Sequence, residues 1–182
     1  MPDKPLVRPV RQGDAAAIAA IYAHHVRHGT ASFDEEGPSD AETLAKTSRI
    51  NGHGWPFLVA EVGGMVAGYA YVTRFRERAA YAFTCENSIY VHPNRIGRGV
   101  GRTLLTRLIV EAEVAGFRQM IAVIGGGEPA SVALHQSLGF VEAGRMRSVG
   151  RKFGEWLDSI YMQRALGSGD TTEPPATPDR KD

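Results

Sequence analysis

The sequence predicts a single α/β or α+β domain in which a mixed β-sheet carries helices on its faces. Helix-like and strand-like segments alternate along the chain, and the polar gaps between them are short. The composition, 43% hydrophobic and 23% charged over 182 residues, is that of one globular domain. We expect this domain over residues 6–166, after an N-terminal extension of residues 1–5. The proline-containing residues 167–182 lack packing side chains and predict a disordered tail.

The first half of the chain predicts a strand, two helices and a hairpin. Asp14 precedes apolar residues at three-to-four spacing, which is typical of a capped amphipathic helix. Ser39 and Glu42 have the spacing of a capping box, and Gly63-Gly64 separates two runs rich in apolar residues as a hairpin turn does. The expected elements are a strand over 6–10, helices beginning near Asp14 and Ser39, the second ending at Asn51-Gly52, and strands over 57–62 and 65–73.

The second half alternates strands and helices. Residues 99–115 form the clearest helical pattern, with apolar residues on one side and Gly116 just past the end. Residues 120–124 are an apolar run that fits a buried strand. The remaining expected elements are a strand over 88–91, a short helix over 130–138 closed by Gly139, and strands over 141–149 and 156–163.

Charge and cysteine content exclude several classes of function. The net charge of +1 gives no global field toward nucleic acid or anionic lipid, so we expect neither as a partner. No segment approaches the ~20 apolar residues that span a bilayer. The only cysteine, Cys85, cannot form an internal disulfide, and the N-terminus lacks the apolar core of a signal peptide. These features predict a cytoplasmic protein.

The densest chemical signal is a strand that leads through a glycine-rich turn into a helix, between Glu86 and Ile109. Three glycines open the turn at a helix N-terminus, where unpaired N–H groups and the helix dipole can hold phosphate oxygens. Three nearby arginines supply local positive charge. The alternative is a plain glycine turn with solvated arginines. The residues concerned are Gly97, Gly99 and Gly101 with Arg95, Arg98 and Arg102.

Two other phosphate-binding loops do not fit this segment. A P-loop requires a lysine before Ser or Thr, whereas the chain has Arg102 before Thr103. A dinucleotide-binding fingerprint requires a third glycine where Leu104 stands. The turn is therefore of another kind.

The turn resembles motif A of the GCN5-related N-acetyltransferase (GNAT) family, in which Gln or Arg is followed by Gly-x-Gly/Ala three positions on. Gly99 and Gly101 match, and Ile96 replaces the usual Gln or Arg. The family's diphosphate contacts come largely from backbone N–H groups, which Ile96 retains. The resemblance implies a mixed, mostly antiparallel sheet of six to seven strands flanked by helices, and acetyl-CoA as the cofactor.

A second signature, GEPASVALHQSLGF over residues 127–140, resembles the family's Asn-x-x-Ser helix beside the pantetheine arm. Ser131 matches, Glu128 replaces the usual Asn, and His135 stands where many members carry a proton-donating tyrosine. With TASFD, RAAYAFTCENS and KFGEWLDSIYMQRAL, these residues are similar to the phosphinothricin N-acetyltransferase subgroup. The resemblance assigns cofactor contacts to Tyr90, Val91, His92, Ile96, Gly97, Arg98, Gly99, Val100, Gly101, Arg102, Glu128 and Ser131.

The resemblance also implies catalytic roles. Glu86 matches the subgroup's general base, which takes a proton from the acceptor amine; read alone, it is equally a solvent-facing carboxylate. His135 suits proton transfer because imidazole titrates near ~6.5, although it can instead be a hydrogen-bonded helix residue or a cofactor contact. Cys85 could form an acyl-enzyme, but a packed thiol is the better interpretation because the family's amine attacks the thioester directly.

A small-molecule amine is the expected substrate. The subgroup suggests phosphinothricin, methionine sulfoximine or methionine sulfone, with an arginine pairing with the anionic group. Alternatives are a peptide N-terminus, a polyamine or an aminoglycoside, or a non-catalytic acyl-CoA sensor. The resemblance further implies a homodimer. His24 and His28 have a spacing that could bind zinc, but no third ligand accompanies them, so we expect no metal site. Candidate substrate contacts are Phe33, Arg76, Arg78, Tyr81, Glu86 and Trp156.

Overall fold

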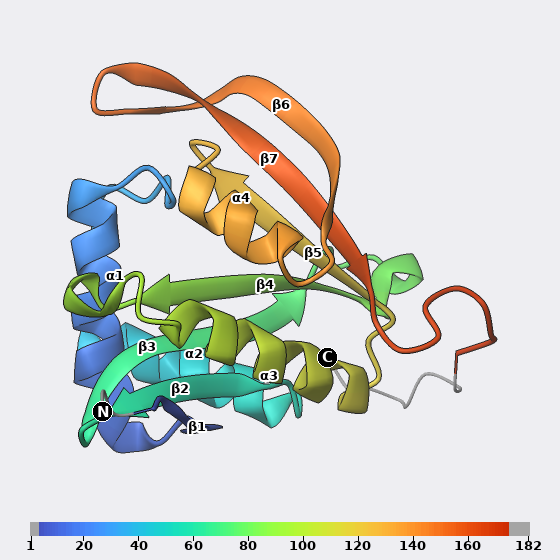
Figure 1. Ribbon diagram of the computed structural model, residues 1–182, viewed down its shortest axis with the longest axis horizontal. Helices are drawn as coiled ribbons and strands as arrows, with labels where there is room; N and C mark the ends of the chain where they lie inside the picture. Colours follow the sequence, from blue (N-terminus) through green and yellow to red (C-terminus); the bar gives the residue numbers. More distant parts are fainter. Residues whose placement is uncertain (1–3, 175–182) are drawn as a thin grey trace.

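Residues 4–174 are described by the computed structural model (Figure 1). Their strands form one seven-stranded sheet in the order β1-β2-β3-β4-β5-β7-β6. Only the central β4–β5 pair is parallel, so the expected mixed, mostly antiparallel sheet is confirmed. The strands are β1 (Leu6–Pro9), β2 (Phe57–Val62), β3 (Met65–Arg74), β4 (Thr84–Val91), β5 (Gln119–Gly125), β6 (Val141–Lys152) and β7 (Glu155–Ala165).

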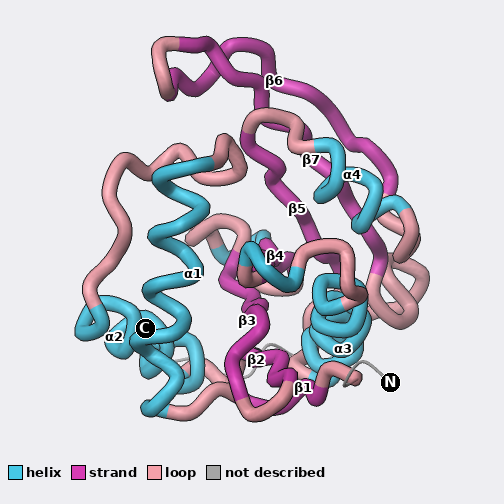
Figure 2. The backbone as a smooth tube through the Cα atoms, turned by 60° about the vertical axis from the view of Figure 1, so that its left-hand side comes forward, coloured by secondary structure: helices cyan, strands magenta, loops and turns pink. Residues whose placement is uncertain are grey.

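Helices cover both faces of the sheet. Helices α1 and α2 pack on one face and α3 and α4 on the other, with the strands between them (Figure 2). The α-helices within residues 4–174 are α1 (Ala15–His28), α2 (Asp40–Gly52), α3 (Val100–Val114) and α4 (Pro129–Gln136). The capping box expected for α2 is present, since Ser39 Oγ accepts from the Glu42 N–H at 3.2 Å and Glu42 Oε2 accepts from the Ser39 N–H at 2.8 Å.

The core fixes the position of α3. Leu104, Leu105 and Leu108 are fully buried between α3 and the sheet, as its apolar face predicts. Each such side chain contributes about 1.5–3 kcal/mol through burial. Gly68 on β3 allows the close approach, because a Cβ there would lie 3.2 Å from Leu104 and from Val100. The N-terminus of α3 is thereby held against the centre of the sheet.

The central strand β4 begins earlier than the sequence predicted. We expected it at Ser88, but it starts at Thr84 and carries Glu86 inside the sheet. Its first half alternates between buried and half-buried residues, with Cys85 and Asn87 inward. Polar side chains at Glu86 and Asn87 conceal this alternation in the sequence, because a buried strand is expected to be apolar.

Strands β4 and β5 separate in the middle of the sheet. They pair only from Thr84↔Gln119 to Asn87↔Ala122, whereas β4 continues to Val91 and β5 to Gly125. The main chain beyond Asn87 on β4 and beyond Ala122 on β5 therefore borders an opening.

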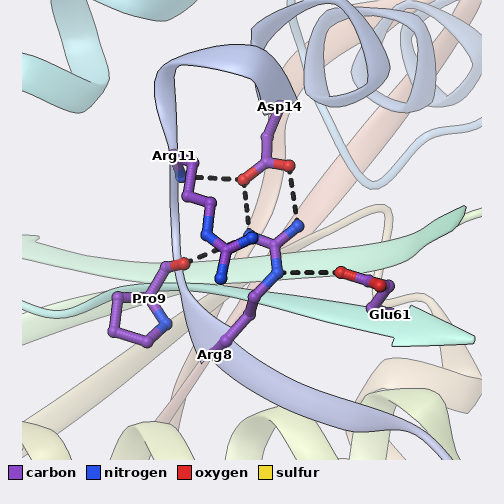
Figure 3. A network of polar contacts seen from close by, with 5 residues as sticks. All are labelled: Arg8, Pro9, Arg11, Asp14 and Glu61. Atoms are coloured by element: carbon purple, nitrogen blue, oxygen red, sulfur yellow. Dashed lines mark hydrogen bonds and ion pairs between the residues drawn. The ribbon is translucent and has the colours of Figure 1, made fainter. Parts of the chain in front are cut away.

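The start of α1 differs from the prediction. Asp14 occupies the N-cap but makes no side-chain cap bond. Instead, its carboxylate accepts two hydrogen bonds from Arg8, at 2.7 and 2.9 Å, and one from the Arg11 N–H at 2.7 Å (Figure 3). Arg8 also donates to Glu61 on β2. A bidentate guanidinium is a stronger partner than a helix amide, so Asp14 joins β1 to α1.

The segment after β7 folds back as far as the structure describes it. Arg118 donates to Ser168, to Thr172 Oγ1 at 3.0 Å and to the Glu173 carbonyl at 3.2 Å. Arg118 thus holds residues 167–174, where the sequence predicted a disordered tail, near the beginning of β5. Residues 175–182, and residues 1–3 of the predicted extension, lie outside the described part.

Candidate active site

The N-terminus of α3 presents free backbone donors. Gly99 is the N-cap, with φ of 80°, and the first intrahelical bond described runs from the Thr103 N–H to the Gly99 carbonyl at 3.0 Å. The N–H groups of Val100, Gly101 and Arg102 consequently have no acceptor in the helix. Gly97, with φ of 74°, supplies the left-handed turn before them. This geometry suits the oxygens of a phosphate group.

A groove of about 610 Å³ leads from these amides to the opening between β4 and β5. Its walls come from α1, the 29–31 segment, β4, the glycine turn and α4. Arg95 and Arg102 line it and supply positive charge, whereas Arg98 and His92 line a different cavity beside α1 and β3. Of the predicted cofactor residues, those that line the groove are Tyr90, Val91, Ile96, Gly97, Gly99, Gly101, Arg102, Glu128 and Ser131.

Three of the predicted cofactor residues have roles in the fold itself. Val100 is 1% exposed and packs in the core, so only its main chain is available. His92 Nδ1 accepts from the Asn94 N–H at 3.2 Å. Glu128 caps α4, because its Oε2 accepts from the Ser131 N–H at 2.8 Å. One oxygen of the Glu128 carboxylate is therefore engaged in capping the helix.

A second cavity, of about 230 Å³, lies where β4 and β5 part. It shares Ala31, Ile89, Tyr90 and Ser131 with the groove, so the two adjoin. Glu86, Asn87 and Ser88 come from β4, residues 122–125 from β5, His135 from α4, Ser159 from β7, and residues 31–33 from the segment after α1.

Glu86 is the carboxylate in this cavity. Burial raises the pKa of Glu86 above its usual value, and the positive charge of Arg76 partly offsets the rise. No hydrogen bond within residues 4–174 engages its oxygens. A desolvated carboxylate without a fixed partner is a stronger proton acceptor than one in water.

His135 is buried at the same junction, 2% exposed. Its Nδ1–H donates to the Ser131 carbonyl at 2.8 Å, and Nε2 lies 3.1 Å from Asn87 Oδ1. Burial lowers the pKa of His135, and the Ser131 carbonyl partly offsets this. Asn87 in turn donates to the Ile121 carbonyl at 3.1 Å. The imidazole thus bridges α4 to the last paired positions of β4 and β5.

Cys85 is fully buried beside these residues. Its thiol donates to the Gln119 carbonyl at 3.5 Å, and burial raises the pKa of Cys85 well above its usual value. A thiolate, the nucleophilic form, is therefore disfavoured here. This environment fits the packed thiol expected from the sequence.

The predicted substrate residues divide into two groups. Phe33 lines the cavity with Glu86. Arg76 stacks on Phe75, 4.1 Å from the ring centre, and acts on Glu86 only through its charge. Arg78 precedes a short 3-10 turn (Ala79–Tyr81). Tyr81 is 38% exposed and Trp156 is 65% exposed. The residues that line the cavity include none of Arg76, Arg78, Tyr81 and Trp156.

Several lining residues were not anticipated. Asn87 is a buried polar residue at an inward strand position, a signal that the sequence contained but that alternation alone did not interpret. Ser159 arrives from β7, whose place beside β5 no local pattern reveals. His24 and His28, rejected as a zinc pair, line the cofactor groove. Within residues 4–174, no group of three metal-ligating side chains gathers at one point.

Comparisons with known proteins agree with this geometry. Residues 7–161 match the family model of the acetyltransferase (GNAT) domain. The chain is 54% identical to phosphinothricin N-acetyltransferase of Alcaligenes faecalis, over 92% of this chain and 86% of that protein. It is 41% identical to L-methionine sulfoximine/L-methionine sulfone acetyltransferase of Salmonella typhimurium, over 88% of this chain and 94% of the relative.

A solved structure has the same fold. The crystal structure of a GNAT superfamily phosphinothricin acetyltransferase from Sinorhizobium meliloti in complex with AcCoA aligns with a TM-score of 0.93 and 45% identity, covering 94% of each chain. This chain therefore belongs to the GNAT family. It is an N-acetyltransferase that uses acetyl-CoA.

The groove is consistent with acetyl-CoA. The free N–H groups of Val100, Gly101 and Arg102, with the guanidinium groups of Arg95 and Arg102, match a diphosphate in charge and donor pattern. The groove then continues to the β4–β5 opening, where an acyl group would meet Glu86.

None of the helices formed by residues 4–174 is long and apolar enough to cross a bilayer.

Proposed function

We propose that the enzyme acetylates the primary amine of a small amino acid or analogue, of the phosphinothricin, methionine sulfoximine or methionine sulfone type. The names of the two relatives support this acceptor class. The observation that carries the proposal is the position of Glu86, in a cavity that adjoins the cofactor groove where β4 and β5 separate. A cavity of about 230 Å³ suits a small acceptor better than an aminoglycoside.

Glu86 acts as the general base in this proposal. An amine with a pKa near ~10 is mostly protonated at pH 7 and must lose a proton to attack. The Glu86 carboxylate accepts that proton, directly or through water, and its burial makes it a better base than an exposed glutamate. When bound, acetyl-CoA supplies an acetyl thioester whose carbonyl carbon is the electrophile.

The Val91 N–H is the proposed donor to the acyl oxygen. The His92 N–H donates to the Ala67 carbonyl on β3 at 2.9 Å. Because successive amides of a strand point to opposite sides, the Val91 N–H and C=O face the opening instead. The C=O is held by His25 Nε2 at 2.8 Å, which leaves the N–H available. A preorganised amide donor of this kind stabilises negative charge on an acyl oxygen.

Phe33 forms the apolar wall of the proposed acceptor pocket. Phe33 lines the cavity together with Glu86 and Ser159. Arg76 does not line the cavity, but its positive charge acts on Glu86, and this charge favours an anionic acceptor and disfavours a polyamine. A zwitterionic amino acid carries charges that complement both the Glu86 carboxylate and the Arg76 guanidinium.

We also propose that the chain works as a cytoplasmic homodimer. Strand β6 is an edge strand exposed along almost its whole length. It and the adjoining turn and strand expose Met146, Val149, Phe153 and Trp156. Exposed apolar side chains on a long edge strand favour burial against a second copy. Light scattering would give twice the chain mass in solution, and a monomer would contradict this part of the proposal.

An acceptor screen tests the function. Purified protein with acetyl-CoA is expected to release free thiol with phosphinothricin, methionine sulfoximine or methionine sulfone, and not with spermidine, kanamycin or a peptide. Activity confined to one of the latter would identify a different amine substrate. Acetyl-CoA binding by calorimetry without thiol release from any amine would instead indicate a non-catalytic sensor.

A further inference from the structure

The segment after α1 forms a wall of both cavities. Residues 31–33 line the cavity that contains Glu86, and residues 29–31 line the cofactor groove. The segment has no regular secondary structure of its own. Its position therefore depends on what it packs against.

Lys152, the last residue of β6, reaches this segment from the tip of the β6–β7 hairpin. It is 7% exposed, and its ammonium donates to the Ser32 carbonyl at 2.7 Å and to the Gly29 carbonyl at 3.2 Å. Gly29 is the C-cap of α1, where the helix dipole favours a cation. Burial lowers the pKa of Lys152, whereas Asp34 and Glu35 raise it. The hairpin tip is thus tied to both ends of the 29–32 turn.

Three glycines form the surface on which the segment rests. A Cβ at Gly150 on β6 would lie 2.3 Å from Phe33 Cε2, and one at Gly125 would lie 3.1 Å from Phe33 Cε1. A Cβ at Gly126 would lie 2.3 Å from Thr30 Oγ1. The Phe33 ring occupies its place in the acceptor cavity only because β5 and β6 carry no side chain there.

We propose that Lys152 and Gly150 are positioning residues for the acceptor pocket: Lys152 fixes the main chain at Ser32, and Gly150 provides the space that seats the Phe33 ring beside Glu86. Neither lines the cavity itself. The kinetic consequence rests on the proposed function, because it assumes a small amine bound between Phe33 and Glu86. The structural consequence does not.

Gly150→Ala, with Gly144→Ala as the matched control, tests the steric part. Both glycines lie on β6 and neither has a positive φ, but a Cβ at Gly144 has nothing within 4 Å. Gly150→Ala should raise the KM for the amine about tenfold and leave the KM for acetyl-CoA within about twofold, since only the Phe33 wall moves. Gly144→Ala should change neither. Equal amine KM values for the two variants would overturn the assignment.

Lys152→Met and Lys152→Arg test the clamp without relying on turnover. Hydrogen exchange of amides 30–34 should be faster in Lys152→Met than in the parent and restored by Lys152→Arg, while exchange in α3 stays unchanged. Unchanged exchange at 30–34 in a folded Lys152→Met would contradict the clamp. If no amine is acetylated by the parent but exchange responds as expected, the proposed function fails and the clamp stands.

Discussion

His135 Nε2 lies 3.1 Å from Asn87 Oδ1, at the last position where β4 and β5 still pair. The Asn87 amide continues to the Ile121 carbonyl on β5, and His135 Nδ1 returns to its own helix at Ser131. Three elements therefore meet through two buried side chains. Burial of the ring and the Nδ1–H bond to the Ser131 carbonyl favour the hydrogen-bonded helix residue over the proton donor, because the neutral ring then carries its proton at Nδ1 and not at Nε2.

Coupling between these two residues is the first prediction. His135→Ala and Asn87→Ala should each lower the free energy of unfolding by about 2–3 kcal/mol, since each leaves a main-chain carbonyl, of Ser131 or of Ile121, without its side-chain donor. The double variant should lose less than the sum, with a coupling energy of about 0.5–3 kcal/mol in urea unfolding. Additive losses would show that the contact carries no energy. A loss of kcat in His135→Ala at unchanged stability would restore the proton-donor role.

The pH profile of kcat/KM should report Glu86. A base must be unprotonated, so the rate falls as pH drops through the pKa of Glu86, which burial places above its usual value. Arg76 lowers that pKa, and Arg76→Met should therefore move the acid limb to higher pH. Arg78→Met is the control, because Arg78 is not among the groups that act on Glu86. An acid limb that stays in place in Arg76→Met would contradict the assignment.

Arg102 and Arg98 should differ in cofactor affinity although they lie four residues apart. Arg102 lines the cofactor groove, whereas Arg98 lines the adjoining cavity beside α1 and not the groove itself. Arg102→Ala should weaken acetyl-CoA binding about tenfold at low salt and reduce its salt dependence, since one phosphate contact is lost. Arg98→Ala should remain within about threefold of the parent by calorimetry. A larger loss of acetyl-CoA affinity in Arg98→Ala than in Arg102→Ala would contradict the assignment of the diphosphate to the groove.

The Arg8–Asp14 pair should contribute to stability in a pH-dependent way. The Arg8 guanidinium holds the pKa of Asp14 below its usual value, so the contribution is complete above the unfolded pKa of ~3.9 and is lost as pH falls through the lower folded value. Asp14→Asn should cost about 2–3 kcal/mol at pH 7 and flatten the loss of stability below pH ~4. Equal acid sensitivity in both proteins would exclude this pair as a cause.

Local patterns were sufficient for most of the fold. The apolar face of α3, the Ser39–Glu42 box and the Gly63-Gly64 turn each predicted an element that the structure contains. The errors fall where tertiary contacts override local preference. Asp14 leaves its capping role for Arg8, and Arg118 orders residues beyond Gly167. Neither a capping pattern nor alternation predicts the pairing of Arg8 with Asp14, and Arg118 lies 54 residues before its partner Thr172.

The site divides in the same way. The glycine turn and Glu86 could be predicted from the sequence because the residues that form the motif lie within one continuous segment. Ser159 and Lys152 were not, because β7 and β6 reach the site only through the strand order of the sheet. Arg76 and Arg78 were expected in the acceptor pocket, yet Arg76 stacks on Phe75 and the side chain of Arg78 is exposed.

Glu86→Gln tests the central claim most directly, because it removes the proton acceptor while keeping the size of the side chain. With phosphinothricin or methionine sulfoximine as acceptor, we predict that kcat/KM falls by about 10²–10⁴-fold and that acetyl-CoA affinity measured by calorimetry stays within about twofold. Turnover within about threefold of the parent at neutral pH would contradict the account.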